Sequence, residues 1–301
     1  MRLGAHLPLA DFGDGTPTAA ELQTFARTAK ELGYTTLAAN DHLLWRRPWL
    51  DGPTALASVA AVAGDMVLAT TVALPVVRQP IVLAKMLATL AVLARGPVVG
   101  GLGPGSSPRD YEAVGIPFEE RWLRFDEALP LVRALVRGDP VDDDTSSAGL
   151  SLAPIPDRPP AVWFASWGSD LRLRAMAGVA DGWFASAYNM APDRYAEARS
   201  RLDGHLRAVG RDPSVFPDAV ATAWAFVTDD RREAEHLLVD VLAPTLNRDP
   251  ALLAHLPIGT ADHCASALAG YAAAGAREVL LWPVRGGARQ LERCMNAASL
   301  M

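Results

Sequence analysis

The chain has 301 residues, half of them hydrophobic, with a formal net charge of −6 and a pI near 5.5. This size suits one large α/β domain or two smaller ones, and the negative charge argues against a nucleic acid as the main partner. No apolar run is long enough to span a membrane, no signal peptide is evident, and the two cysteines lack metal-ligand spacing. We therefore expect a cytoplasmic protein with reduced thiols and no membrane partner.

Short apolar runs alternate with helical patterns through the first 137 residues. The pattern predicts strands over Arg2–Leu7, Thr35–Ala39, Val67–Leu74 and Val98–Leu102, and helices over Ala19–Leu32, Thr54–Ala63, Ile81–Ala94 and Glu119–Arg137. Asp139–Pro160 breaks this rhythm, because Pro, Asp and Ser are frequent there and helical periodicity is lost. This segment predicts an insertion with a short hairpin around Leu150–Leu152.

The alternation resumes after the insertion. Strands are predicted over Ala161–Ala165, Gly182–Ala187, Ala219–Val227 and Glu278–Pro283, and helices over Asp170–Ala180, Asp193–Val209, Arg231–Leu242 and Thr260–Ala274. Eight such units with strands apolar on both faces indicate a (β/α)₈ TIM barrel in a single domain, residues 1–301. An open doubly wound sheet is the alternative, but no GxGxxG follows the first strand.

A glycine-rich loop, residues 100–107, follows the fourth predicted strand. Glycine allows a backbone to approach a ligand closely, and barrel enzymes place their active sites at the carboxyl ends of the strands. We therefore expect Gly103 and Ser106 to border a bound small molecule.

The second strand ends at the pair Asp41-His42, with Trp45 close behind. A carboxylate, an imidazole and an indole at one strand end could handle protons and stack on a planar ligand, so all three are candidate catalytic residues. A helix-capping Asp beside an incidental histidine is the ordinary alternative. His6, in the first strand, could either pack in the core or face the mouth of the barrel.

Two further strand ends carry candidate binding residues. Thr70 and Thr71, followed by Val72, could bond the polar edge of a ring, or the hydroxyls could satisfy the backbone. Ser166, Trp167, Gly168 and Ser169 precede a helix, whose free N–H groups attract anions, although a simple N-cap would look similar. No motif for a metal, a Walker loop or a nucleophilic triad occurs. A bound organic cofactor would explain such a site.

The chain resembles the bacterial luciferase-like flavin and deazaflavin oxidoreductases almost end to end. The resemblance rests on four segments in the same order: ELGYTTLAANDHLLW, the stretch from LATTVALPVV to RWLRFDEAL, PPAVWFASWGSDLRLRAMAGVADGWFAS, and IGTADHCASALAGYAAAGAREVLLWPV. The resemblance implies a (β/α)₈ barrel that binds F420 or FMN, and a homodimer with Ile81–Ala94 as a candidate interface element.

The resemblance also assigns roles. It implies that Asp41-His42 lies beside the ring, that Thr71-Val72 is joined by a non-prolyl cis peptide behind it, and that Gly168-Ser169 holds the cofactor phosphate. Ser106 stands where sugar-phosphate dehydrogenases of the family place a proton-donating glutamate, which argues against sugar-phosphate oxidation.

The expected function is hydride transfer between F420 and a small organic substrate, with His42 handling the proton. Four arginines are expected at the rim, where they could attract the acidic tail of F420: Arg46, Arg47, Arg78 and Arg109. An FMN-dependent two-component monooxygenase is the first alternative, and a cofactor-free binding or structural barrel is the second.

Overall fold

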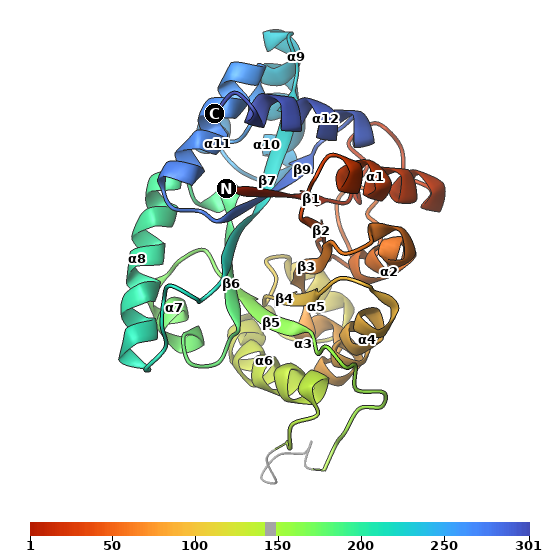
Figure 1. Ribbon diagram of the computed structural model, residues 1–301, viewed down its shortest axis with the longest axis vertical. Coiled ribbons are helices and arrows are strands. Elements are labelled where there is room, and N and C mark those ends of the chain that lie inside the picture. The colour runs from red at the N-terminus through yellow and green to blue at the C-terminus, as the bar shows by residue number, and fades with distance from the viewer. Residues whose placement is uncertain (142–148) are drawn as a thin grey trace.

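Parallel strands close into a barrel in the computed structural model, which describes residues 1–141 and 149–301 (Figure 1). Eight strands form the ring: β1 (Arg2–His6), β2 (Thr36–Ala39), β3 (Val67–Ala73), β4 (Val98–Leu102), β5 (Ala161–Ala165), β6 (Gly182–Ser186), β7 (Asp218–Val227) and β9 (Glu278–Pro283). Strand β9 pairs with both β7 and β1, which closes the ring. The two-residue strand β8 (Ile258–Gly259) extends the end of β7.

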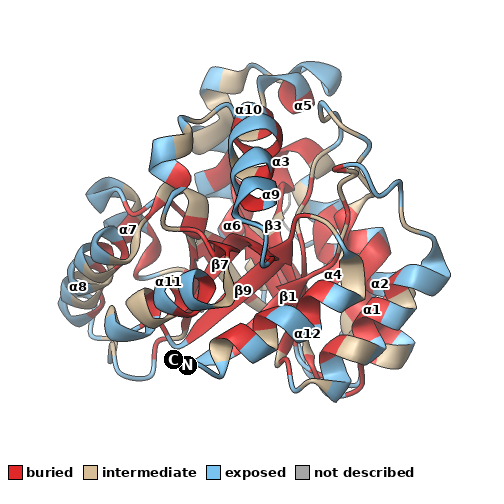
Figure 2. Ribbon diagram, turned by 90° about the horizontal axis from the view of Figure 1, so that it is seen from above, coloured by how far each residue is buried: buried red, intermediate tan, exposed pale blue. Residues whose placement is uncertain are grey.

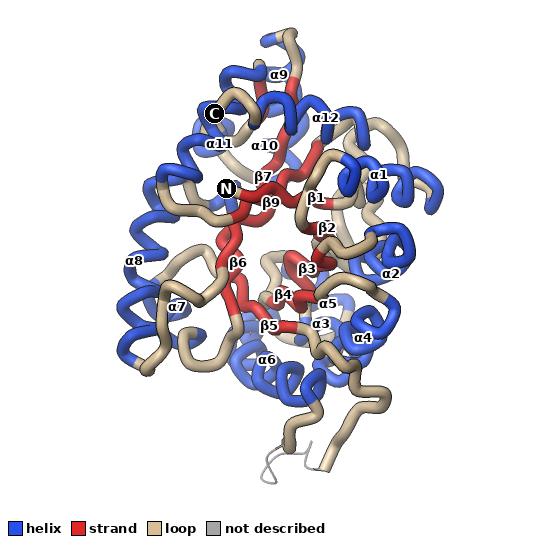
Figure 3. Tube along the Cα trace, in the orientation of Figure 1, coloured by secondary structure: helices blue, strands red, loops and turns tan. Residues whose placement is uncertain are grey.

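Helices surround this ring on the outside (Figure 3). They are α1 (Ala19–Glu31), α2 (Gly52–Ala63), α3 (Pro75–Arg78), α4 (Pro80–Leu93), α5 (Pro108–Ala113), α6 (Arg121–Arg137), α7 (Asp170–Met176), α8 (Pro192–Ala208), α9 (Arg231–His236), α10 (Ala243–Leu246), α11 (Ala261–Ala273) and α12 (Gly287–Ala298), with 3₁₀ turns at Phe118–Glu120, Ala187–Asn189 and Pro250–Leu253 and a π-helical segment at Leu237–Leu242. Side chains that cap the first backbone N–H groups fix where two of these helices begin. Thr18 and Glu21 form a capping box on α1, and Asp51 caps α2.

The strands are buried on both faces, as a helix-covered parallel barrel requires (Figure 2). One core fills the space between strands and helices, and a second, smaller cluster lies inside the barrel and includes Ala69, Phe184 and Leu280. Gly101 lets the barrel pack tightly at this level, since an added Cβ would lie 2.7 Å from the Phe184 ring. The interior below the site is therefore a packed core.

The predicted (β/α)₈ barrel is confirmed, with strand ends within one or two residues of those expected. The expected hairpin is wrong where it can be seen, since Leu150–Leu152 belong to neither helix nor strand, and residues 142–148 lie outside the described part. The short helices α3 and α5 and the final helix α12 were missed. In the described chain, no helix is both long and apolar enough to cross a membrane.

Candidate functional site

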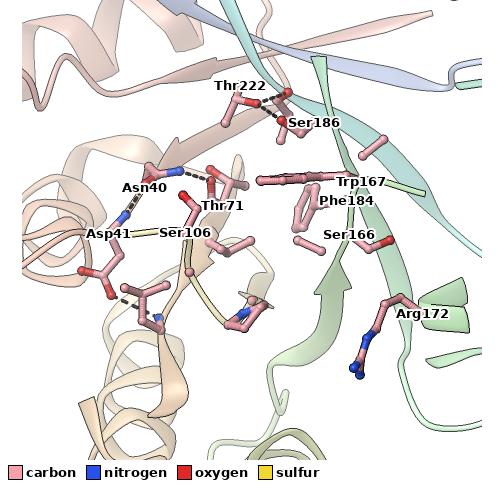
Figure 4. A pocket seen from close by; sticks show the side chains of 18 of the residues that line it. Asn40, Asp41, Thr71, Ser106, Ser166, Trp167, Arg172, Phe184, Ser186 and Thr222 are labelled. Carbon is pink, nitrogen blue, oxygen red and sulfur yellow. Dashed lines mark hydrogen bonds between the residues drawn. The ribbon is translucent and has the colours of Figure 1, made fainter. Parts of the chain in front are cut away.

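A cavity of about 350 Å³ opens at the carboxyl ends of strands β2 to β6 and along β7. The predicted site residues that line it are Asp41, His42, Thr71, Val72, Gly103, Ser106, Ser166, Trp167 and Ser169. Figure 4 shows Asn40, Thr71 and Ser106 on one side and Trp167 and Phe184 on the other. Segments more than 100 residues apart in the chain thus meet around one space.

Three predicted site residues do not line this cavity. Thr70 is fully buried, and its hydroxyl donates to the Gly101 carbonyl at 2.8 Å. It therefore bonds a backbone carbonyl, which was the alternative to its predicted role in ligand binding. Trp45 stacks on the His42 ring, with the ring centroids 4.1 Å apart, and therefore helps to hold the imidazole in place. Gly168 has a φ of 76° and forms the turn between two lining residues, where its N–H bonds the Ser166 hydroxyl.

His42 is held by a carboxylate that the sequence analysis did not single out. Its Nδ1 lies 2.8 Å from Oδ2 of Asp110, which is 1% exposed, while Oδ1 of Asp110 accepts the backbone N–H groups of Leu43 and Leu44. An ionised carboxylate only accepts hydrogen bonds, so the His42 proton sits on Nδ1. When the ring is neutral, the lone pair is on Nε2, which has no partner among the described residues. This arrangement is that of an oriented general base.

Asp41 lines the same cavity, but its carboxylate is committed elsewhere. Both oxygens accept from Arg78, each at 2.6 Å, and Oδ2 also accepts the backbone N–H of Leu74. Arg78 bonds Asp51, the N-cap of α2, as well. The bidentate pair favours a positioning role for Asp41 over the proton-handling role expected for it.

Hydroxyl and amide groups line one part of the cavity. Asn40 Nδ2 donates to the Thr71 carbonyl at 2.7 Å, and the peptide bond from Thr71 to Val72 is cis, as the family resemblance implied. Across from them, the hydroxyls of Ser186 and Thr222 lie 3.0 Å apart. These groups could bond the polar edge of a planar ligand.

Aromatic rings and one guanidinium line the opposite part. Trp167 is 56% exposed at the mouth, and Phe184 lies beside it (Figure 4). Arg172 stacks over Trp122 with 4.0 Å to the ring centroid and bonds both oxygens of Asp126 at 2.8 Å. In Figure 4, Arg172 lies at the far end of the view from Ser186 and Thr222. The cavity therefore has a hydroxyl-lined end and a cationic end, where the charge of Arg172 is paired with that of Asp126.

The arginines expected at the rim are mostly occupied. Arg78, expected in a rim loop, lies in the short helix α3 with its side chain 11% exposed and paired with Asp41. Arg46 donates to the Pro244 carbonyl, and Arg47 donates to the Thr245 hydroxyl. Arg109, in α5, is exposed. The cations that line the cavity are instead Arg121 and Arg172.

His6 is packed in the core, which was one of the two positions predicted for it. Its ring stacks on Trp282 at 4.4 Å and is fully buried, and this burial lowers its pKa from 6.5 to about 3. Below pH 6.5, His6 is protonated in the unfolded chain but stays neutral in the folded chain. The free energy of unfolding therefore falls as the pH falls toward 3.

We expect this histidine to contribute a loss of about 1.4 kcal/mol of unfolding free energy for each pH unit below about 6. Urea unfolding at several pH values measures the slope. His6→Gln should flatten it relative to the native chain, whereas His236→Gln, at an exposed position, should not. Equal slopes in the native chain and in His6→Gln would contradict a neutral buried imidazole.

Sequence reasoning missed Asn40, Asp110, Arg121, Trp122, Arg172, Phe184, Ser186, Tyr188, Ala221 and Thr222. An available signal was the Ser-Pro-Arg-Asp segment that starts a helix directly after the glycine loop, which places Asp110 in a first helical turn. Asn40 directly follows β2 and Ser186 ends β6, so their positions at strand ends were a second signal. The others gave none, because their side chains meet only once the barrel has closed. The described residues contain no group of three or more His, Cys, Asp or Glu that could hold a metal ion.

Known proteins share this fold and sequence pattern. A family model described as luciferase-like monooxygenase matches residues 1–252. The chain belongs to this family. The expected resemblance is thereby confirmed, and the cavity lies where luciferase-like barrels, like other TIM barrels, carry their active sites.

Two of the curated relatives show how far the sequence similarity extends. A phthiodiolone/phenolphthiodiolone dimycocerosates ketoreductase of Mycobacterium sp. (strain JLS) is 29% identical over 69% of this chain and 63% of its own length. An F420-dependent glucose-6-phosphate dehydrogenase of Beutenbergia cavernae is 32% identical over 56% of this chain and 52% of its own length. The chain thus spans between half and two thirds of these relatives.

A solved structure shows the same fold over the whole chain. The monooxygenase RslO1 from Streptomyces bottropensis superposes with a TM-score of 0.82, at 20% identity, and the match covers 100% of this chain and 99% of that one. At this identity the likeness establishes the luciferase-like barrel architecture.

Proposed function

We propose that the protein is an F420-dependent oxidoreductase that transfers hydride between the deazaflavin and a small organic substrate. The observation that carries the proposal is the pair of His42 and Asp110, which leaves one imidazole nitrogen free beside the cavity. Hydride transfer to or from a carbon that bears oxygen requires a proton to move at that oxygen. His42 Nε2 is the group that could move it.

The residues present fit a planar cofactor with a phosphate. Trp167, Phe184 and Val72 offer flat apolar surfaces, and the hydroxyl-lined end offers partners for a polar ring edge. Ser166, Ser169 and Arg172 supply hydroxyls and a cation at the other end, and the Ser169 side chain caps no helix N–H. We assign the phosphate to this cationic end, with Gly168 forming its turn.

F420 supplies the hydride donor or acceptor when it is bound. His42 accepts the hydroxyl proton at Nε2 when an alcohol is oxidised and returns it when a carbonyl is reduced. Asp110 fixes the orientation of the imidazole and stabilises its protonated form. Asp41 and Arg78 hold the loop that carries His42, Gly103 and Ser106 border the reacting end, and Trp45 supports the imidazole ring.

The name of one curated relative, an F420-dependent dehydrogenase, supports F420 over FMN. Ser106, rather than an acid, at the glycine loop speaks against a sugar-phosphate substrate. The name of the solved monooxygenase supports the FMN alternative. The two differ in their need for dioxygen, so the test is oxidation of reduced F420 by carbonyl compounds under anaerobic conditions. A reaction that requires both dioxygen and FMN would contradict the proposal.

Arg172→Gln should weaken the binding of F420 and of FMN alike, by on the order of 10-fold, because a charged hydrogen bond to phosphate is lost. Fluorescence titration measures both dissociation constants. Arg174→Gln, at an exposed position on the same helix, is the matched control and should bind normally. Equal affinities in Arg172→Gln and Arg174→Gln would place the phosphate elsewhere.

We also propose a cytoplasmic homodimer built on a single barrel domain. Helix α4 supports the dimer because Ile81, Val82, Val92 and Leu93 are between 40% and 57% exposed on it. These residues form two apolar pairs at the two ends of the exposed face of α4, with Lys85 and Thr89 between them. Exposed apolar side chains of this kind can mark an interface. Sedimentation velocity tests the assembly, and a monomer at micromolar concentration would contradict it.

A further inference from the structure

A neutral imidazole lies beneath the floor of the cavity. His6 Nε2 is 3.1 Å from the backbone nitrogen of Thr222, and a backbone N–H can only donate, so Nε2 carries a lone pair. Since His6 is fully buried and has no ionic partner among the described residues, the ring holds its single proton on Nδ1. The tautomer of His6 is thus fixed by the fold.

The proton on Nδ1 faces the hydroxyl of Thr71, with 3.3 Å between Nδ1 and Oγ1. Oγ1 therefore accepts from His6, and its own proton has no other acceptor among the described residues. Thr71 lines the cavity, so the remaining direction for that proton is toward whatever is bound there. The bond from His6 thus uses one of the two acceptor lone pairs of the Thr71 hydroxyl and leaves its proton free to be donated to a ligand.

The same imidazole holds a second lining residue. Thr222 has a φ of 56°, a left-handed conformation that is rare for a β-branched residue and persists only where its surroundings enforce it. The bond to His6 Nε2 is one restraint, and the contact of its hydroxyl with Ser186 is another. His6 therefore contacts two lining residues on different strands, Thr71 on β3 and Thr222 on β7.

We propose that His6 is a positioning residue that commits the Thr71 hydroxyl to donate a hydrogen bond to an acceptor atom on the bound deazaflavin. The inference rests on the proposed function for the identity of the ligand. The imidazole itself touches no ligand and transfers no proton. The stack of His6 on Trp282, with the two rings 4° from parallel, keeps it at the correct angle for both bonds.

A double-mutant cycle on F420 affinity tests this role. Thr71→Val removes the hydroxyl at nearly constant volume, and His6→Phe keeps a ring against Trp282 but removes both hydrogen bonds. Each single change should raise the F420 dissociation constant about 5- to 10-fold, and the double variant should be no weaker than the singles. His6→Gln, which can both accept and donate, should bind within about 3-fold of the native chain.

Two outcomes would overturn the inference: multiplied losses in the double variant, or full affinity in Thr71→Val. Failure of the native protein to bind F420 would instead contradict the proposed function. Nitrogen NMR of labelled histidine in the native protein gives a reading that needs no variant to fold. We expect His6 protonated at Nδ1, and protonation at Nε2 would overturn the inference by itself.

Discussion

Replacing His42 with alanine should lower turnover by about 10²-fold or more while the barrel remains folded, because the group that moves the proton is lost. The substitution should slow the chemical step rather than weaken cofactor binding. We therefore expect the F420 dissociation constant to change little. Steady-state kinetics, followed by the absorbance of the deazaflavin, measures turnover, and circular dichroism checks the fold. Unchanged turnover would remove His42 from the mechanism.

A companion variant separates the imidazole from its support. Asp110→Asn keeps the shape of the side chain but removes the charge that fixes the proton of His42 on Nδ1. Turnover should fall by at least about 10-fold, since a ring with the wrong tautomer presents an N–H where a base is needed. His205→Ala, at a partly exposed ion pair with Asp170 on the outer helices, is the matched control and should leave turnover unchanged.

Arg78→Met should lower the unfolding free energy by about 3–5 kcal/mol, because it leaves the carboxylate of Asp41 buried without a counter-ion. That carboxylate is 1% exposed and accepts both bonds from this guanidinium. Urea denaturation provides the measurement.

Two controls make the result specific. Arg95→Met breaks a pair whose partners, Arg95 and Asp65, are 75% and 86% exposed, and it should change stability little. Combining Arg78→Met with Asp41→Asn removes the uncompensated charge and should recover part of the loss. A loss no larger than that of Arg95→Met would show that the pair is not buried in solution.

The fold was predictable because it depends on patterns local in the chain. Apart from Thr70, Thr71 and Glu278, Val67–Leu74 and Glu278–Pro283 are apolar at every second position and at the positions between, as expected of strands covered on both faces. The insertion resisted prediction, since Leu150–Leu152 carries alternation but pairs with no strand among the described residues.

The site was predictable only where a residue follows its own strand directly. Asp41 and His42 stand at the end of β2, and Thr71 stands near the end of β3, so strand order placed them in the cavity. Asp110 is 68 residues from His42 in the chain, and their contact depends on how the loop after β4 folds back. His6 likewise takes its role from the backbone of Thr222, 216 residues away.

The roles of Asp41 and Arg78 show a further limit of sequence reasoning. A carboxylate at a strand end has the right chemistry for proton transfer, and an arginine in a rim loop has the right charge for an acidic cofactor tail. Placed 2.6 Å apart, each satisfies the other instead. Composition and position cannot reveal this, because the pairing is decided by the short helix α3, whose four residues show no detectable period.

The most direct test of the central claim is a fluorescence titration of the purified protein with F420 and, separately, with FMN. We expect saturable F420 binding in the micromolar range, competition between the two cofactors for one site, and FMN binding at least about 10-fold weaker than F420 binding. Tight FMN binding with negligible F420 binding would contradict it in favour of a flavin monooxygenase. Binding of neither cofactor would contradict any enzyme function that depends on them.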